Sequence, residues 1–263
     1  MEIVTDDLMS QKAKTFVNLL NNNIDSSAEL AYNHLVKADA LRMKNYFWES
    51  IDEYLLVIKY DKTCIDAYKG LGFSYKQTGF TQSAVSAFNN AKKLSPFDKI
   101  LYYEAGCCYC MDKKYDKAIK EFKKALKICP EYEEAKLNLA LALELGGQFD
   151  LAIKNYFKII ESHPENVAAY NALGSLYIKM EMYSKAIKTF RQLLKINKEY
   201  SRAYLGIAIS FDKMNSNTDS MRYYKKYIKL KPNCGNLPFI LDRLKELRNI
   251  TIPKKKSHLQ LVS

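Results

Sequence analysis

The sequence is poor in the residues and motifs from which catalytic and metal sites are commonly built. Among its 263 residues are three histidines and one tryptophan. It has no glycine-rich phosphate-binding loop, no nucleophile elbow and no paired metal-binding motif. Nor does any apolar run approach the roughly 20 residues that span a membrane as a helix. We therefore expect a protein without enzymatic activity, cofactor, bound metal or membrane span.

Export features are also missing from the beginning of the sequence. The stretch MEIVTDDLMSQKAKTF carries two early aspartates and lacks an apolar core followed by a small-residue cleavage site. Six cysteines in a chain of this length, without an export signal, indicate free thiols rather than a disulfide framework. We therefore expect a cytoplasmic protein.

Three columns of residues recur along the chain at a spacing of 34 positions. The first column contains only small residues: Ala38, Gly72, Gly106, Ala140, Gly174 and Ala208. The second lies twelve positions later and is also small: Ser50, Ala84, Ala118, Ala152, Ala186 and Ser220. The third follows four positions after that and is aromatic: Tyr54, Phe88, Phe122, Tyr156, Phe190 and Tyr224. The chain is therefore a repeat protein.

Each repeat unit is predicted to be a pair of amphipathic helices. Apolar positions recur at intervals of three and four, and no unit contains a period-2 stretch. Turn signals such as QTGF and LGGQF separate the two halves of a unit, and prolines close four of the units. Small side chains let paired helices approach to about 8–10 Å, while an aromatic ring fills the space between successive pairs.

The two best-preserved units carry the pattern of a known family. These patterns are Tyr68, Leu71, Gly72, Tyr75, Ala84, Phe88, Ala91, Pro96 and then Tyr102, Gly106, Tyr109, Ala118, Phe122, Ala125, Pro130. Both resemble a complete tetratricopeptide repeat. The resemblance implies an all-α, right-handed superhelical solenoid of about six helix-turn-helix units. The units are expected at residues 31–64, 65–98, 99–132, 133–166, 167–200 and 201–234.

The segments that flank the repeats have different predicted roles. Residues 1–30 are expected to form an N-terminal helix, over about residues 6–20, and a polar linker in which Ser26 and Glu29 have capping-box spacing. Residues 235–250 are expected to form a C-terminal capping helix. Its apolar face comprises Leu237, Ile240, Leu241, Leu244 and Leu247. The basic tail, residues 251–263, has little to pack and is expected to be disordered.

The stretch AGCCYC concentrates three of the six cysteines in the third unit. Cys108 occupies a register position that is mostly small in the other units, which favours a buried packing role. Cys107 and Cys110 are expected to point to the inner surface. A structural zinc site usually needs a second such pair, which the sequence lacks. We therefore favour packing and surface thiols over a metal or redox site.

The resemblance also implies where a partner would bind. First helices of such repeats line a concave groove, with positions 2, 5, 6, 9, 12 and 13 of each unit facing into it. The candidate groove residues are Lys69, Phe73, Lys76, Tyr103, Glu104, Cys107, Leu137, Asn138, Leu141, Glu144, Asn171 and Lys179. We expect an adaptor or scaffold that holds an extended or helical segment of a partner protein there. The N-terminal helix or a second copy of the chain could instead cover this strip.

Two other functions remain open on the sequence alone. The net charge of +12 and a lysine stripe on the second helix of unit three are compatible with a basic solenoid that binds nucleic acid or another polyanion. Nucleic acid is disfavoured because most aromatics fall in the packing columns rather than beside the lysines. A secretion-type chaperone is a further alternative. Some members of the resembled family bind the C-terminal carboxylate of a chaperone through a clamp of Lys, Asn and Arg on successive first helices. Such a cochaperone is disfavoured here, because position 9 of the units is never asparagine.

Overall fold

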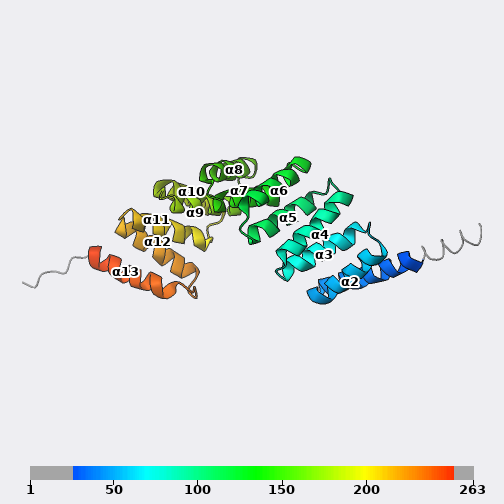
Figure 1. Ribbon diagram of the computed structural model, residues 1–263. Helices are drawn as coiled ribbons and strands as arrows, with labels where there is room; N and C mark the ends of the chain where they lie inside the picture. Colours follow the sequence, from blue (N-terminus) through cyan, green and yellow to red (C-terminus); the bar gives the residue numbers. More distant parts are fainter. Residues whose placement is uncertain (1–25, 252–263) are drawn as a thin grey trace, which may run out of the picture. The chain divides into compact units, whose positions relative to one another are not determined.

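The computed structural model describes residues 26–251, and within that range all regular structure is helical (Figure 1). Residues 26–43 are helical and precede twelve further helices. These are α2 (Phe47–Tyr60), α3 (Ile65–Gln77), α4 (Thr81–Leu94), α5 (Lys99–Met111), α6 (Tyr115–Ile128), α7 (Glu133–Leu145), α8 (Phe149–Ser162), α9 (Val167–Lys179), α10 (Tyr183–Ile196), α11 (Ser201–Lys213), α12 (Asn217–Leu230) and α13 (Leu237–Thr251). The fold is an all-α helical repeat solenoid, as the sequence predicts.

One predicted boundary near the beginning of the chain is wrong. Residues 26–30 were expected in a polar linker, yet they are helical. Ser26 and Glu29 are exposed, and their capping-box spacing is itself typical of the first turn of a helix rather than of a linker. The predicted helix over residues 6–20 and all of the predicted tail beyond Thr251 lie outside the described residues.

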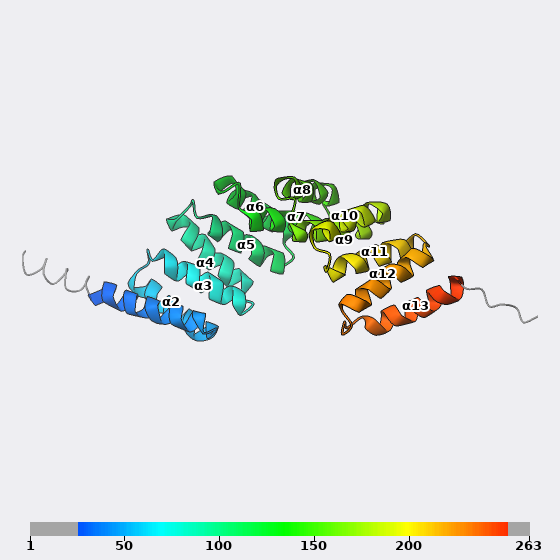
Figure 2. The same cartoon turned by 180° about the vertical axis from the view of Figure 1, so that it is seen from behind.

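The chain divides into two compact units, Met1–Asn138 and Leu139–Ser263, with the division inside α7. In the first unit, α2 to α6 pack in chain order, each against the next, and α3 also contacts α5. In the second, α8 to α13 do the same, and α9 contacts α11. Figure 2 shows these neighbours from behind. First helices therefore lie beside first helices within each unit.

The turn inside every helix pair contains one residue in the left-handed region. The six residues are 34 positions apart: Asn45, Gly79, Lys113, Gly147, Glu181 and Asn215, with φ between 58° and 83°. At the third turn, the Lys114 N–H donates to the Tyr109 carbonyl over 2.8 Å, and the Lys113 N–H donates to the Cys110 carbonyl over 3.0 Å. This pair of bonds is a Schellman motif, which satisfies carbonyls at the end of the first helix.

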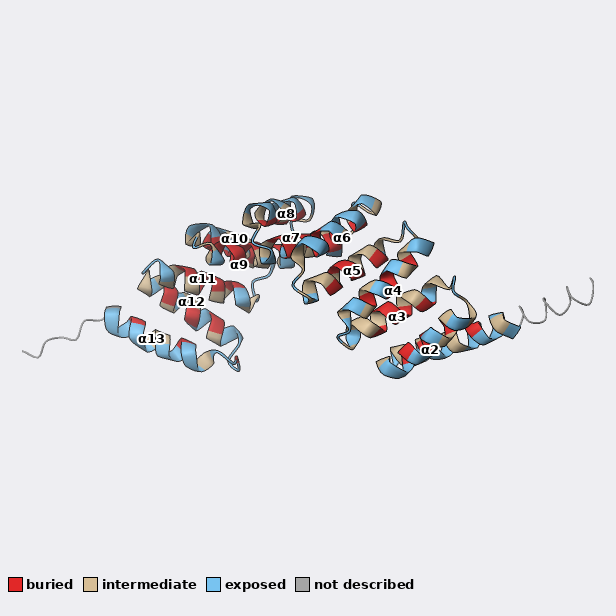
Figure 3. Cartoon of the chain, viewed as in Figure 1, coloured by how far each residue is buried: buried red, intermediate tan, exposed pale blue. Residues whose placement is uncertain are grey.

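Every member of the three columns is buried, and Figure 3 shows the buried positions in red along the helices. Every member of the second column is fully buried, and every aromatic of the third is 0–3% exposed. Phenylalanine occurs in the third column where the first column has glycine, and tyrosine occurs where it has alanine. In the glycine units the ring lies directly on the helix backbone, since a Cβ on Gly72, Gly106 or Gly174 would approach it to 2.5–2.6 Å.

The buried tyrosines of the third column need hydrogen-bond partners for their hydroxyls. Tyr54 donates to Asp39 Oδ1 over 2.6 Å, Tyr156 donates to Glu144 Oε2 over 3.0 Å, and Tyr224 donates to Asp212 Oδ2 over 3.2 Å. Burial, followed by the nearby carboxylate, raises the pKa of all three hydroxyls above the ordinary range. Each acceptor lies on the first helix of the same repeat, so the bond joins the two helices of a pair.

The last helix, α13, packs on α12. Ile240 and Leu247 are buried there, in a cluster with Tyr224 and Tyr227. Leu241 was expected on the same apolar face, but its side chain is 44% exposed. The helix turns about 100° per residue, so Leu241 points away from the stripe through Ile240 and Leu247.

Candidate partner-binding surface

Two cation–carboxylate pairs lie between the first helices of the first unit. Lys69 Nζ, on α3, lies 3.0 Å from Oδ2 of Asp98, the residue that caps α5. Lys76, also on α3, pairs with Glu104 on α5, and both side chains are largely buried, at 19% and 10% exposure. Three of these four residues, Lys69, Lys76 and Glu104, were predicted to line the groove, and each forms an ion pair within the chain. They connect successive repeats, and their charges are already compensated.

Asn138 connects α7 to α5 on the same surface. Its amide donates to the Tyr103 hydroxyl over 2.9 Å and lies 3.8 Å from Cys107 Sγ. The Tyr103 ring also packs against Tyr132, with centroids 5.0 Å apart. Burial and the neighbouring Cys107 sulfur raise the pKa of Tyr103 above its ordinary range. Three predicted groove residues thus form one hydrogen-bonded cluster.

The three thiols of the cysteine-rich stretch are buried or half-buried. Cys108 is fully buried, as expected, while Cys107 and Cys110 are half-buried. Burial raises the pKa to about 11 for Cys107 and Cys110 and to about 12 for Cys108. Within residues 26–251 no three histidine, cysteine or acidic side chains are grouped as metal ligands would be. At neutral pH these thiols stay protonated, and a protonated thiol is a poor nucleophile and ligand.

The remaining apolar candidates of the first unit are half-buried. The Phe73 ring makes an edge contact with Phe88 of the third column at 5.6 Å, and the Lys76 ammonium lies 5.4 Å from the Phe73 centroid. Leu137, on α7, is also half-buried. These side chains therefore contribute part of their surface to the repeat core and expose the rest.

In the second unit, a hollow of about 450 Å³ lies on the first helices α9 and α11. Its lining comprises Asn171, Ser175, Ile178, Phe190, Arg202, Leu205, Gly206, Ile209, Tyr227, Lys231, Cys234, Gly235 and Asn236, and we call it the first-helix hollow. Of the predicted groove residues, only Asn171 lines it. Six other lining residues occupy the same register positions in units five and six, so the register could have identified them.

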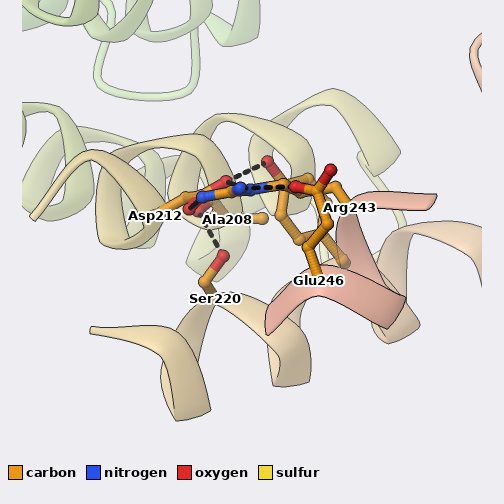
Figure 4. Close-up of polar contacts among 6 residues, drawn as sticks. Ala208, Asp212, Ser220, Arg243 and Glu246 are labelled. Atoms are coloured by element: carbon orange, nitrogen blue, oxygen red, sulfur yellow. Dashed lines mark hydrogen bonds and ion pairs between the residues drawn. The ribbon is translucent and has the colours of Figure 1, made fainter. Parts of the chain in front are cut away.

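A second hollow, of about 630 Å³, adjoins the first at Ile209 and extends to α13. Its lining includes Asp212 and Lys213 of α11 and Phe239, Arg243 and Glu246 of α13. Figure 4 shows that Arg243 of α13 is bonded to both Asp212 and Glu246. Its Nε and Nη2 donate to the two oxygens of Asp212 over 3.0 and 2.7 Å, and its Nη1 donates to Glu246 over 2.7 Å.

The last predicted residues lie on the second unit without lining the first-helix hollow. Leu141, on α7, is 42% exposed. Glu144 accepts the bond from Tyr156 described above, so its carboxylate is engaged. Lys179, at the end of α9, is exposed, with its ammonium 4.9 Å from the Phe149 ring centroid. Of these three, Leu141 offers the most apolar surface to a partner.

No helix in the described part of the chain is both long enough and apolar enough to cross a bilayer. A search of curated protein sequences gives no significant match.

Several solved structures share the fold of this chain. MamA shares 24% identity and a TM-score of 0.61 over 66% of this chain and 96% of its own. YrrB, a tetratricopeptide repeat protein with an unusual peptide-binding site, shares 18% identity and a TM-score of 0.57 over 73% and 97% of the two chains. Part of a repeat protein from Cytophaga hutchinsonii shares 18% identity and a TM-score of 0.69 over 82% and 85%.

Family models agree with the register read from the sequence. Models described as tetratricopeptide repeat match residues 100–132, 134–166, 167–200 and 201–234, together about half of the chain. Repeats of this kind act as protein-interaction scaffolds. The matches, the 34-residue columns and the helix pairs agree: the chain belongs to the tetratricopeptide repeat family.

Proposed function

We propose that the protein is a non-enzymatic scaffold that binds an extended or helical segment of a partner protein on the first helices of its repeats. The first-helix hollow is the observation that carries this proposal. It presents both apolar side chains, such as Leu205 and Ile209, and polar groups of Asn171, Arg202 and Asn236. Such a mixture suits a peptide, whose side chains fill apolar pockets while its backbone needs hydrogen-bond partners.

The first unit would contribute mainly apolar contacts. Lys69, Lys76 and Glu104 already pair within the chain, and a partner that recruited them would first have to break these pairs. The exposed parts of Phe73, Tyr103, Cys107 and Leu137 carry no such cost. We therefore expect affinity there to come from aromatic and aliphatic contacts.

The polyanion alternative is less well supported than a protein partner. On the second helices, lysines lie over the tyrosine rings that a nucleic acid base would stack on. Lys92 and Lys124 lie 4.7 and 5.7 Å from the Tyr102 centroid, and Lys117 lies 5.7 Å from that of Tyr109. Lys92 and Lys124 also pair with Glu121, which lowers their net attraction for phosphate.

The proposal is tested by capture of partners on the full chain and on variants of each surface. One variant changes the first-helix hollow and combines Leu205→Asp with Ile209→Asp. The other variant changes partly exposed apolar side chains and combines Phe73→Ala, Tyr103→Ala and Leu141→Ala. Partners captured from a lysate are identified by mass spectrometry, and their binding to purified variants is then measured. Leu230→Asp, at an exposed position of α12, is the control for an added charge.

We expect each surface variant to weaken binding at least about tenfold, equivalent to about 1.4 kcal/mol, and the control to bind normally. Circular dichroism verifies that each variant keeps its helix content. Partners that bind all folded variants as tightly as the original chain would show that the first helices are not the binding surface.

A further inference from the structure

Another pocket of the second unit is distinct from the two hollows described above. It has a volume of about 510 Å³ and is lined by Phe157 and Ile160 of α8, Tyr170, Leu173 and Tyr177 of α9, and Lys185, Lys188, Thr189 and Gln192 of α10. It shares no lining residue with the first-helix hollow. We call it the second-helix pocket, because six of its nine residues lie on the second helices α8 and α10.

The wall of this pocket is apolar and partly exposed. Phe157 is 44% exposed although it lies beside Ile160 in a helix of a packed repeat. Leu173 and Tyr177 are buried and form the base. A concave, mostly apolar pocket with a few polar groups is the usual form of a ligand site, and this one has room for a bulky apolar side chain.

The polar side of the pocket is positively charged. Lys185 and Lys188 are both exposed, and within the described residues neither is in an ion pair with a carboxylate. The Lys185 ammonium instead lies 5.7 Å from the Tyr177 ring centroid. Their helix, α10, also carries Arg191 and Lys195 and has no acidic residue. No carboxylate on α10 therefore offsets the charge of Lys185 and Lys188, whereas Lys69 and Lys76 in the first unit are each paired with one.

We infer that the second-helix pocket binds an acidic peptide segment through one bulky apolar side chain, with neighbouring carboxylates paired to Lys185 and Lys188. The apolar wall supplies the place for the anchor, and the unpaired ammonium groups supply the complementary charge. Stacking of a nucleic acid base on Tyr177 is less compatible with the site, because this ring is only 5% exposed. A scaffold with this site would hold two different segments at once.

The inference is tested by selecting random peptides, displayed on phage, for binding to the purified full chain. The same selection is made on the variant Lys185→Glu with Lys188→Glu and on the variant Phe157→Ala. The matched control is Lys225→Glu with Lys229→Glu, which makes the same change of charge at exposed positions of α12. Selected peptides are then synthesised, labelled with fluorescein and titrated against each protein by fluorescence anisotropy.

We expect one class of selected peptides to contain a bulky apolar residue next to glutamate or aspartate. Its affinity should fall at least about tenfold with either pocket variant, stay within about twofold with the control, and not change with Leu205→Asp and Ile209→Asp in the first-helix hollow. Loss of binding with the hollow variant but not the pocket variants would overturn the inference while supporting the proposed function. The absence of any acidic class of peptides would also overturn it. An equal loss of affinity with the control variant would overturn it too, because it would show a general effect of charge. Self-association that the pocket variants abolish would identify a second copy as the occupant and contradict the peptide assignment.

Discussion

Gly106 lies so close to Phe122 that a Cβ atom at this position would be 2.6 Å from the ring carbon Cε1. The same relationship holds between Gly72 and Phe88, at 2.5 Å. In these units the first helix has no side chain at the contact, so the ring of the second helix rests on its backbone. The absence of a side chain at one position therefore fixes the distance between the two helices of a repeat.

Replacing Gly106 by alanine should destabilise the protein. Alanine is favoured over glycine in a helix by about 1 kcal/mol, but overpacking of a core commonly costs about 1–3 kcal/mol. We expect the clash with Phe122 to dominate, with a net loss of about 1 kcal/mol or more in urea unfolding. Gly235→Ala is the control, since a Cβ there meets no atom within 4 Å. Equal stability of Gly106→Ala and the original chain would contradict the close contact.

The left-handed turn residues predict a stabilising substitution. Glu181 has φ of 59°, a conformation that costs a residue with a side chain roughly 1 kcal/mol relative to glycine. Glu181→Gly should therefore raise the stability by about that amount. Gly147→Ala should lower it by a similar amount, because Gly147 has φ of 78° and a Cβ there would contact nothing. Thermal melting of both variants checks the two signs together.

Much of the fold follows from the sequence because its columns encode packing directly. Small residues recur at 34-residue intervals because two helices meet closely at these positions in every unit. The aromatic column identifies the side chains that fill the space between these helices. The backbone conformation of the turns is harder to predict from the sequence. Gly79 and Gly147 mark two of them, whereas Lys113 and Glu181 take the same backbone conformation without the residue type that usually signals it.

The candidate binding surface was only partly predictable, for two physical reasons. Register identifies positions on the first helices that line a hollow, as for Asn171, but it does not identify which charged side chains neutralise each other. The partners of Lys69 and Lys76 lie 29 and 28 residues further along the chain, at the N-cap of α5 and within α5, and the pairing depends on side-chain reach. Hollows depend on the relative sizes of many side chains, so neither the first-helix hollow nor the second-helix pocket was visible in the sequence.

The pair between Lys76 and Glu104 predicts a difference between single and double substitutions. Both side chains are largely buried, so Glu104→Ala would leave the Lys76 ammonium without compensation, at a cost of about 3 kcal/mol. The double variant Lys76→Met with Glu104→Leu should recover most of that loss. Asp242→Ala, which removes the partner of Lys245 in an exposed pair, should cost less than about 1 kcal/mol. A single variant as stable as the original chain would show that the pair contributes nothing to the repeat interface.

The raised thiol pKa values predict slow alkylation in the folded protein. At pH 8, a cysteine with a pKa of about 11, such as Cys107 or Cys110, has on the order of 100-fold less thiolate than an ordinary cysteine. Iodoacetamide labelling followed by peptide mass mapping should therefore be at least that much slower in the folded chain than in urea. Labelling should accelerate as the pH rises towards 11. Rapid labelling of Cys107 at pH 8 would reopen a reactive role for this stretch.

The proposal that a partner binds on the first helices is tested most directly by photo-crosslinking from single positions. A benzoylphenylalanine at Ile209, in the first-helix hollow, should crosslink to the captured partner, whereas one at Lys229, on an exposed part of α12, should not. Crosslinking from Lys229 with none from Ile209 would contradict the proposal.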